Sequence, residues 1–169
     1  PSEHMTLEDF RDAFDVHVYG PLHTTLAVLP EMRARKAGRI VNISSIGGRL
    51  PVPHLLPYCD SKAALTALAE GLRAELGRDG ISVTTVSPGL MRTGSPRHAI
   101  FKGQHQLEYA WFGTSAATPL ISMQIERAAR KIVAASLVGR ADLVISPQAV
   151  LGATFHGVFP GLTAPLFGW

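Results

Sequence analysis

The feature that most constrains the fold of this chain is a pair of short apolar runs, one on either side of a long helical pattern. The first run, 39–45, is apolar at Ile40, Val41 and Ile43 and ends in small polar residues. This pattern is typical of a strand that is buried on both faces. Leucines recur at helical intervals from 58 to 78, and a second apolar run follows at 81–86. A helical crossover of this length joins parallel strands, and such units are right-handed. The chain is therefore predicted to be α/β, built on part of a doubly wound parallel sheet.

The other predicted elements keep the same alternation. A helix begins after the N-cap candidate Thr6 and ends at Gly38, with either a kink or two successive helices at Pro21. The glycines and prolines of 47–57 predict a loop. Farther along, the sequence predicts an irregular region, a helix and a third strand. These lie at 90–119, 121–138 and 141–146.

Composition excludes several classes of protein. Sixteen basic and 13 acidic side chains are interspersed, so no basic stripe for nucleic acid is present. The seven histidines lack metal-ligand spacing, and no nucleophile elbow or phosphate-cradling P-loop sequence occurs. The single cysteine, Cys59, cannot form an internal disulfide, which favours a cytoplasmic protein.

The C-terminal segment has an unusual charge pattern. No Asp, Glu, Lys or Arg follows Asp142, while glycines and prolines interrupt the apolar residues too often for a membrane-spanning helix. We predict that 147–169 is an apolar segment covering the rest of the protein. The alternative is a tail that dips into a membrane, because its aromatic residues suit that interface as well as a core.

A tyrosine and a lysine four residues apart carry the clearest chemical signal. Tyr58 and Lys62 share one face of the predicted helix. At an effective dielectric constant of about 20, an ammonium about 5 Å away stabilises a phenolate by about 3 kcal/mol, which predicts a pKa roughly two units lower for Tyr58. Ser45, after the first strand, supplies a hydroxyl that could hold a carbonyl or alcohol oxygen. Taken alone, the pair is also compatible with an exposed helix that carries one aromatic and one lysine.

Three successive motifs resemble those of the short-chain dehydrogenase/reductase family, classical type. They are Arg-Ile-Val-Asn-Ile-Ser-Ser at 39–45, Tyr-Cys-Asp-Ser-Lys-Ala-Ala at 58–64 and Ser-Pro-Gly-Leu-Met-Arg-Thr at 87–93. The resemblance covers about 6–138 and implies a Rossmann-like sheet. It also implies that 1–146 is the C-terminal portion of such a domain, with 90–119 as its substrate lid.

The resemblance implies roles for individual residues. Tyr58 is similar to the general acid/base of the family, Lys62 to the residue that lowers its pKa and holds the nicotinamide ribose, and Ser45 to the hydroxyl that positions the substrate oxygen. Ser44 is a neighbouring candidate, but the spacing to Tyr58 favours Ser45. The expected cofactor-binding residues are Tyr58, Lys62, Pro88, Gly89 and Thr93.

Two departures from the family pattern change the expectation. His17 stands where the family has an asparagine that completes a proton relay, so His17 either relays protons or replaces the asparagine structurally. No glycine-rich dinucleotide fingerprint occurs in the sequence. We therefore expect a truncated chain that lacks the N-terminal, adenosine-binding half and binds NAD or NADP poorly by itself.

Two functions remain open at this stage. The first is an NAD(P)-dependent oxidoreductase that interconverts a secondary alcohol and a ketone, with this chain inactive alone. The second is a non-catalytic remnant or binding module of the same fold. The resemblance also implies a homodimer through the helices at 6–35 and 58–78, where alanines allow close helix approach.

Overall fold

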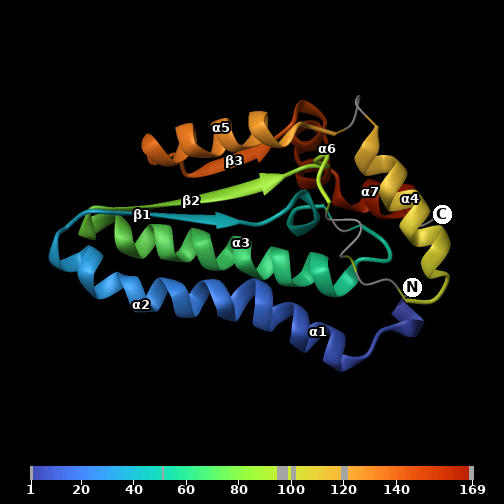
Figure 1. Ribbon diagram of the computed structural model, residues 1–169, viewed down its shortest axis with the longest axis horizontal. Helices are drawn as coiled ribbons and strands as arrows, with labels where there is room; N and C mark the ends of the chain where they lie inside the picture. The colour runs from blue at the N-terminus through green and yellow to red at the C-terminus, as the bar shows by residue number, and fades with distance from the viewer. Residues whose placement is uncertain (1, 51, 95–98, 100–101, 119–121, 168–169) are drawn as a thin grey trace.

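Three parallel strands form the centre of the protein (Figure 1). The computed structural model describes residues 2–50, 52–94, 99, 102–118 and 122–167. The strands lie in the order β1–β2–β3, with Gly38 opposite Ile81 and Thr85 opposite Asp142. Their bounds are Gly38–Ile43, Ile81–Pro88 and Asp142–Ile145. The predicted parallel α/β arrangement is confirmed.

One long helical segment with a π-helical turn inside it forms the N-terminal layer. After a short 3-10 turn, Ser2–His4, come α1 (Leu7–Phe14), the π-helical turn η2 (Asp15–Tyr19) and α2 (Gly20–Ala34). Thr6 donates from its backbone and its hydroxyl to the Asp9 carboxylate, which fixes the start of α1. Pro21 follows the π-helical turn directly, and the wider hydrogen-bond pattern of that turn, with the Gly20 N–H on the Asp15 carbonyl, accommodates its missing N–H. Of the two expected arrangements at Pro21, the chain adopts the one that keeps a single helical segment, because residues 7–34 stay helical and the π-helical turn before the proline marks the irregularity.

Helix α3 (Leu56–Leu76) lies beside α2 under the sheet. It begins two residues before the predicted start, because Pro57 occupies its first turn and is compatible with a helix there. A short turn, η3 (Ile46–Gly48), precedes α3, and η4 (Gly77–Asp79) follows it. The core on this side of the sheet contains Leu29, Ala69, Leu76, Ile81 and Val83.

Helix α5 (Ile125–Leu137) packs on the opposite face of the sheet. Its small residues Ala128 and Ala135 bury against Val86, Leu143 and Ile145. The sheet is therefore enclosed by α2 and α3 on one face and by α5 on the other. The carboxyl ends of the strands point toward the remaining helices (Figure 1).

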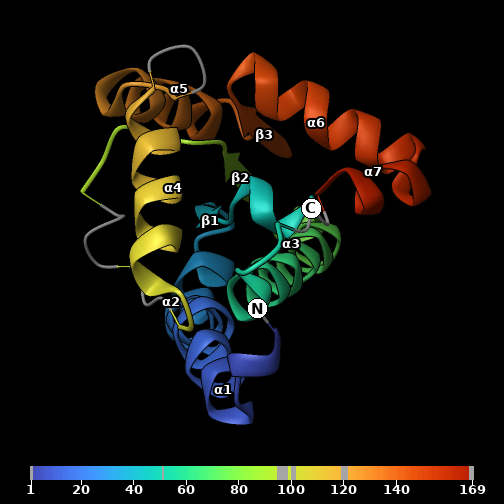
Figure 2. The same cartoon turned by 90° about the vertical axis from the view of Figure 1, so that its right-hand side faces the viewer.

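The region predicted to be irregular, 90–119, contains helix α4 (His105–Ala117). The prediction was wrong here because apolar residues are spread around this helix and give no single stripe. Helix α4 lies beyond the carboxyl ends of β1 and β2 (Figure 2). Lys102, before it, pairs with Asp9 of α1 at 2.6 Å. Of the predicted lid, 95–98, 100–101 and 119 lie outside the described residues.

The charge-free C-terminal segment forms two helices, α6 (Pro147–Val158) and α7 (Pro160–Phe167) (Figure 2). Pro147 and Pro160 each stand at the start of a helix, where proline is favoured. Ser146 caps α6 by accepting a hydrogen bond from the Ala149 N–H at 3.2 Å. Within the described ranges, no helix is long and apolar enough to cross a membrane.

Candidate active site

The predicted catalytic groups come from the carboxyl end of β1 and the first turns of α3. Ser45 follows β1 and begins the turn Ile46–Gly48, while Tyr58 and Lys62 lie one helical turn apart near the start of α3. Ser44 donates its N–H to the Val86 carbonyl at 2.7 Å, which continues the β1–β2 pairing to this edge. The edge is where open parallel sheets bind ligands.

Ser45 and Tyr58 are brought together as the sequence predicted. Both side chains lie around Gly47, where Ser45 is within hydrogen-bonding reach of Tyr58, and the Ser45 oxygen accepts from the Gly47 N–H at 3.1 Å. Ser44 has a different role, because its hydroxyl donates to the Lys62 carbonyl at 2.8 Å and lies 2.9 Å from the Thr66 hydroxyl. The structure therefore places Ser45, rather than Ser44, against the tyrosine.

The predicted lowering of the Tyr58 pKa is wrong for this chain. Burial raises the pKa of Tyr58 above its usual value of 10.0, and the Ser45 hydrogen bond opposes this only in part. The Lys62 ammonium donates to the Ile43 carbonyl at 3.0 Å and lies 5.8 Å from the centre of the Tyr58 ring. Burial also lowers the pKa of Lys62. Desolvation thus outweighs the attraction that the spacing predicted.

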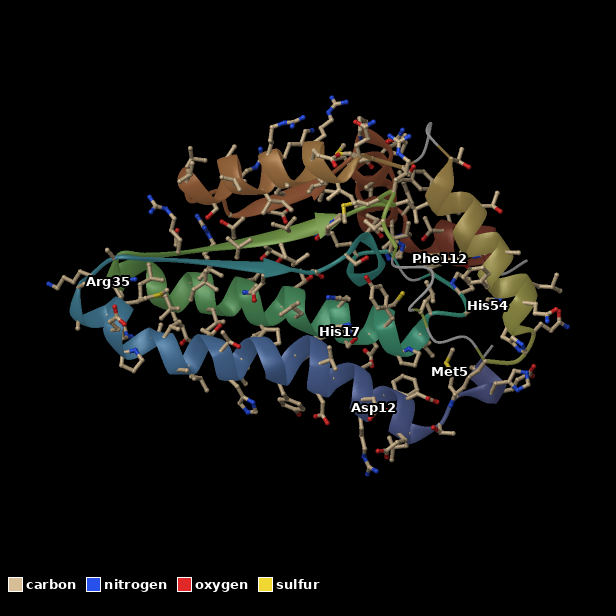
Figure 3. The ribbon with its side chains drawn as sticks, in the orientation of Figure 1. Met5, Asp12, His17, Arg35, His54 and Phe112 are labelled. Atoms are coloured by element: carbon tan, nitrogen blue, oxygen red, sulfur yellow. The ribbon has the colours of Figure 1, made fainter. Side chains whose placement is uncertain are left out.

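His17 lies on the π-helical turn between α1 and α2, facing α3 (Figure 3). Its Nδ1 is 2.8 Å from the Ser61 hydroxyl, and its ring meets the Tyr58 ring edge-on with centroids 5.4 Å apart. Because Ser61 donates to the Tyr58 carbonyl, we assign the hydrogen to Nδ1 and leave Nε2 as an acceptor. Burial, and to a lesser extent Lys62, lowers the pKa of His17 to about 4. The ring is therefore neutral at pH 7.

The neutral His17 ring predicts a specific loss of stability in acid. Between its unfolded pKa of 6.5 and its folded pKa of about 4, the unfolded chain binds more protons, so stability falls as the pH falls through this window. After discounting for partial exposure, we expect His17 to account for about 1–2 kcal/mol of that loss. Denaturant unfolding of wild-type protein and His17→Gln at about pH 7 and about pH 4.5 measures it. Equal pH slopes would contradict the assignment, and exposed His23→Gln is the control.

Sequence reasoning missed Arg49, which ties the serine-bearing turn to the sheet. Its Nε donates to the Ser87 hydroxyl at 2.7 Å, and its Nη2 pairs with the Asp142 carboxylate at the start of β3. Ser87 is completely buried, so this contact reaches the interior beside Pro88. Nothing in the spacing of Arg49 and Asp142 along the chain signals their proximity.

The predicted cofactor-binding turn after β2 occupies the same edge of the sheet. Gly89 donates its N–H to the Ile145 carbonyl at 3.1 Å, and a Cβ there would lie 3.0 Å from both Ala149 Cβ and Ser146 Oγ. Close packing against α6 is therefore one reason for glycine at this position. Thr93 lies half-buried beyond the turn, with its N–H on the Met91 carbonyl at 2.9 Å.

Comparisons with known proteins agree with this geometry. The sequence profile of the family described as short chain dehydrogenase matches residues 1–100. The chain belongs to this family. It is 45% identical over 85 residues to a dehydrogenase/reductase SDR family protein 7-like of Anopheles gambiae, covering 50% of this chain and 27% of that one. It is 41% identical over 91 residues to the uncharacterized oxidoreductase YusZ of Bacillus subtilis, covering 54% and 32%.

Solved structures of short-chain dehydrogenases share the fold. A short-chain dehydrogenase from Streptomyces avermitilis superposes with a TM-score of 0.75 at 32% identity, over 99% of this chain and 62% of that one. A gluconate 5-dehydrogenase from Burkholderia cenocepacia, solved with NADP and tartrate, superposes with a TM-score of 0.68 at 25% identity, over 89% and 59%. The chain thus matches less than two thirds of these proteins, and about a third or less of the two curated relatives.

The residues present fit one end of a nicotinamide cofactor. Tyr58 and Lys62 supply a hydroxyl and an ammonium at the start of α3, and the Pro88–Gly89 turn follows β2 at the same edge of the sheet, a set that suits a ribose and a nicotinamide ring. A pyrophosphate needs glycines that let it approach a helix N-terminus closely, and the sequence lacks that fingerprint. The fit is therefore limited to the reactive end of the cofactor, because the sequence has no glycine-rich pyrophosphate loop.

Proposed function

We propose that this chain is the catalytic portion of an NAD(P)-dependent oxidoreductase that interconverts a secondary alcohol and a ketone. The observation that carries this proposal is that Ser45 and Tyr58 come together around Gly47, with the Lys62 ammonium 5.8 Å from the centre of the Tyr58 ring. Two hydroxyls at the carboxyl edge of a parallel sheet can both reach one substrate oxygen.

The chemistry divides between this chain and the cofactor. The nicotinamide ring would supply or accept the hydride at the substrate carbon. In the reducing direction, Tyr58 gives its proton to the substrate oxygen while Ser45 donates a hydrogen bond to that oxygen. Lys62 holds the ribose and favours the phenolate form of Tyr58 once the proton has left. His17 fixes the Tyr58 ring through its edge-on contact and its bond to Ser61.

The free edge of β1 supports docking of a dinucleotide-binding half at that edge. The strand pairs with β2 alone within the described sheet, and an open groove runs between it and α2. Asn42, in this strand, is 6% exposed, and its Nδ2 has no hydrogen-bond partner within the described structure. A buried amide without a partner is costly, so an additional strand with a carbonyl facing Asn42 would stabilise the edge.

Binding and activity measurements test the proposal together. Calorimetric titration of the 169-residue chain should show only weak binding of NADH and NADPH. The same chain joined to a dinucleotide-binding half should oxidise NADH or NADPH in the presence of ketones. Micromolar binding by the chain alone would contradict the expected truncation. Failure of the joined protein to act on a broad ketone panel would favour the second candidate, a non-catalytic binding module, which the missing dinucleotide fingerprint also favours.

The homodimer remains a proposal that the exposed helix surfaces support. On α3, Ala63, Ala67 and Ala74 are exposed, and a Cβ at Gly71 would meet no atom within 4 Å. Ala69, also expected at the interface, is instead completely buried in the core. Light scattering should give the mass of a dimer that Ala67→Glu dissociates, and a monomeric wild-type protein would contradict the proposal.

We also propose a cytoplasmic location. Cys59 is a free, buried thiol, as is usual where thiols stay reduced. Cell fractionation with protease protection tests this location, and recovery in a secreted fraction or in the lumen of a membrane compartment would contradict it.

A further inference from the structure

Helix α6 has small residues on its inner side and large apolar residues on its exposed side, the reverse of a usual surface helix. The side that faces the rest of the protein carries small residues: Ala149 is buried, and Gly152 and Ala153 are half-buried. A Cβ at Gly152 would lie 3.6 Å from Leu50, so this side meets the turn before α3. The large apolar residues lie on the opposite side, where Leu151 is 72% and Val158 62% exposed.

The exposed apolar surface continues across the junction with α7. Phe155 and Phe159 contact each other with ring centroids 5.4 Å apart, and Leu162 of α7 is also exposed. We define the apolar face by the residues Val150, Leu151, Phe155, Val158, Phe159 and Leu162. A contiguous face of this kind marks an interaction site in a water-exposed protein.

The charge pattern distinguishes between possible occupants of the apolar face. The sequence has no charged residue from 143 to 169, so the face has no charged rim of its own to fix a protein partner in one register. Basic residues instead lie on α5, the helix that precedes β3 as α6 follows it. Three exposed basic side chains lie on α5: Arg127, Arg130 and Lys131. The acidic residue of this helix is Glu126, and among the described residues none forms an ion pair with the three basic side chains. Helices α5 and α6 both lie along the upper side of the molecule beyond β3 (Figures 1 and 2).

We propose that the apolar face of α6 and α7 binds the surface of a lipid membrane, with the basic residues of α5 meeting anionic headgroups. Apolar side chains without charges enter the headgroup boundary at no electrostatic cost, whereas flanking lysines and arginines are attracted to anionic lipid. The helices are 12 and eight residues long, which suits lying in the membrane plane rather than crossing it. This inference does not depend on the proposed oxidoreductase activity.

Vesicle sedimentation of the 169-residue chain tests the proposal. The chain should sediment with vesicles of phosphatidylcholine mixed with phosphatidylglycerol, and less with phosphatidylcholine alone. Leu151→Gln should weaken binding to mixed vesicles about tenfold. Lys131→Gln should weaken binding about fivefold, and only when phosphatidylglycerol is present. Leu7→Gln is the matched control, because Leu7 is 65% exposed at the start of α1, and it should leave binding unchanged.

Four results would overturn the proposal. The first is that the chain sediments with neither kind of vesicle, and the second is that Leu151→Gln binds mixed vesicles as well as wild type. The third is that Leu7→Gln weakens vesicle binding as much as Leu151→Gln does. The fourth is that the chain forms a dimer without lipid and that Leu151→Gln converts this dimer to a monomer. The last result would assign the apolar face to a second copy of the chain. Val158→Gln supplies a second variant on the same face, and thermal melting by circular dichroism verifies that each variant is folded.

Discussion

Replacing Tyr58 by phenylalanine should lower turnover of the complete oxidoreductase by roughly 10²–10⁴-fold, the range that a positioned proton donor contributes. The substitution removes the hydroxyl that bonds Ser45 and keeps the ring that packs edge-on against His17. Cofactor affinity should change much less than turnover, because Lys62 remains. Steady-state kinetics and calorimetry on the chain joined to its dinucleotide-binding half measure the two effects separately.

Tyr19→Phe is the control for the loss of a tyrosine hydroxyl. Tyr19 is 48% exposed on the π-helical turn and contributes nothing to the Ser45 pairing. Its replacement should leave turnover within about twofold of wild type. Retention of full activity by Tyr58→Phe would eliminate Tyr58 as the proton donor, and a joined protein without activity before substitution would instead count against the proposed function itself.

Gly48→Ala should lower the free energy of unfolding by about 2–3 kcal/mol. A Cβ at Gly48 would lie 2.7 Å from the backbone carbon and oxygen of Lys62 and 2.9 Å from the Ser44 hydroxyl. Backbone atoms within α3 cannot turn aside as a flexible side chain can, so the turn that carries Ser45 must move. Denaturant unfolding measures the loss, and reduced activity of the joined protein should accompany it.

Gly71→Ala, within α3, should change the free energy of unfolding in the opposite direction. An added Cβ would meet nothing within 4 Å there, so alanine should raise the free energy of unfolding by about 0.5–1 kcal/mol through its helix propensity. If Gly48→Ala were as stable as wild type, the close approach between the serine turn and α3 would not hold in solution.

Local patterns were sufficient to predict the framework of this protein. The apolar runs in β1 and β2 and the helical period of α3 act over a few residues, so their structure follows from nearby sequence. The spacing of Ser45 and Tyr58 predicted that they share a site, and the fold brings their side chains together around Gly47. Helix α4 was missed because its apolar residues have no single stripe, and the helices of the tail were missed because prolines at helix starts resemble breakers.

Period and spacing along the chain were enough to predict the order of the three strands, the helices that cover the sheet, and the residues expected at its carboxyl edge. The tertiary structure alone decided how those residues behave. Burial raises the pKa of Tyr58 although Lys62 lies one turn away, and it keeps His17 neutral beside Ser61. The pairing of Arg49 with Asp142 and the outward apolar face of α6 likewise depend on packing between distant segments. Desolvation and long-range contacts arise only when segments distant in the sequence pack together, and no local pattern encodes them.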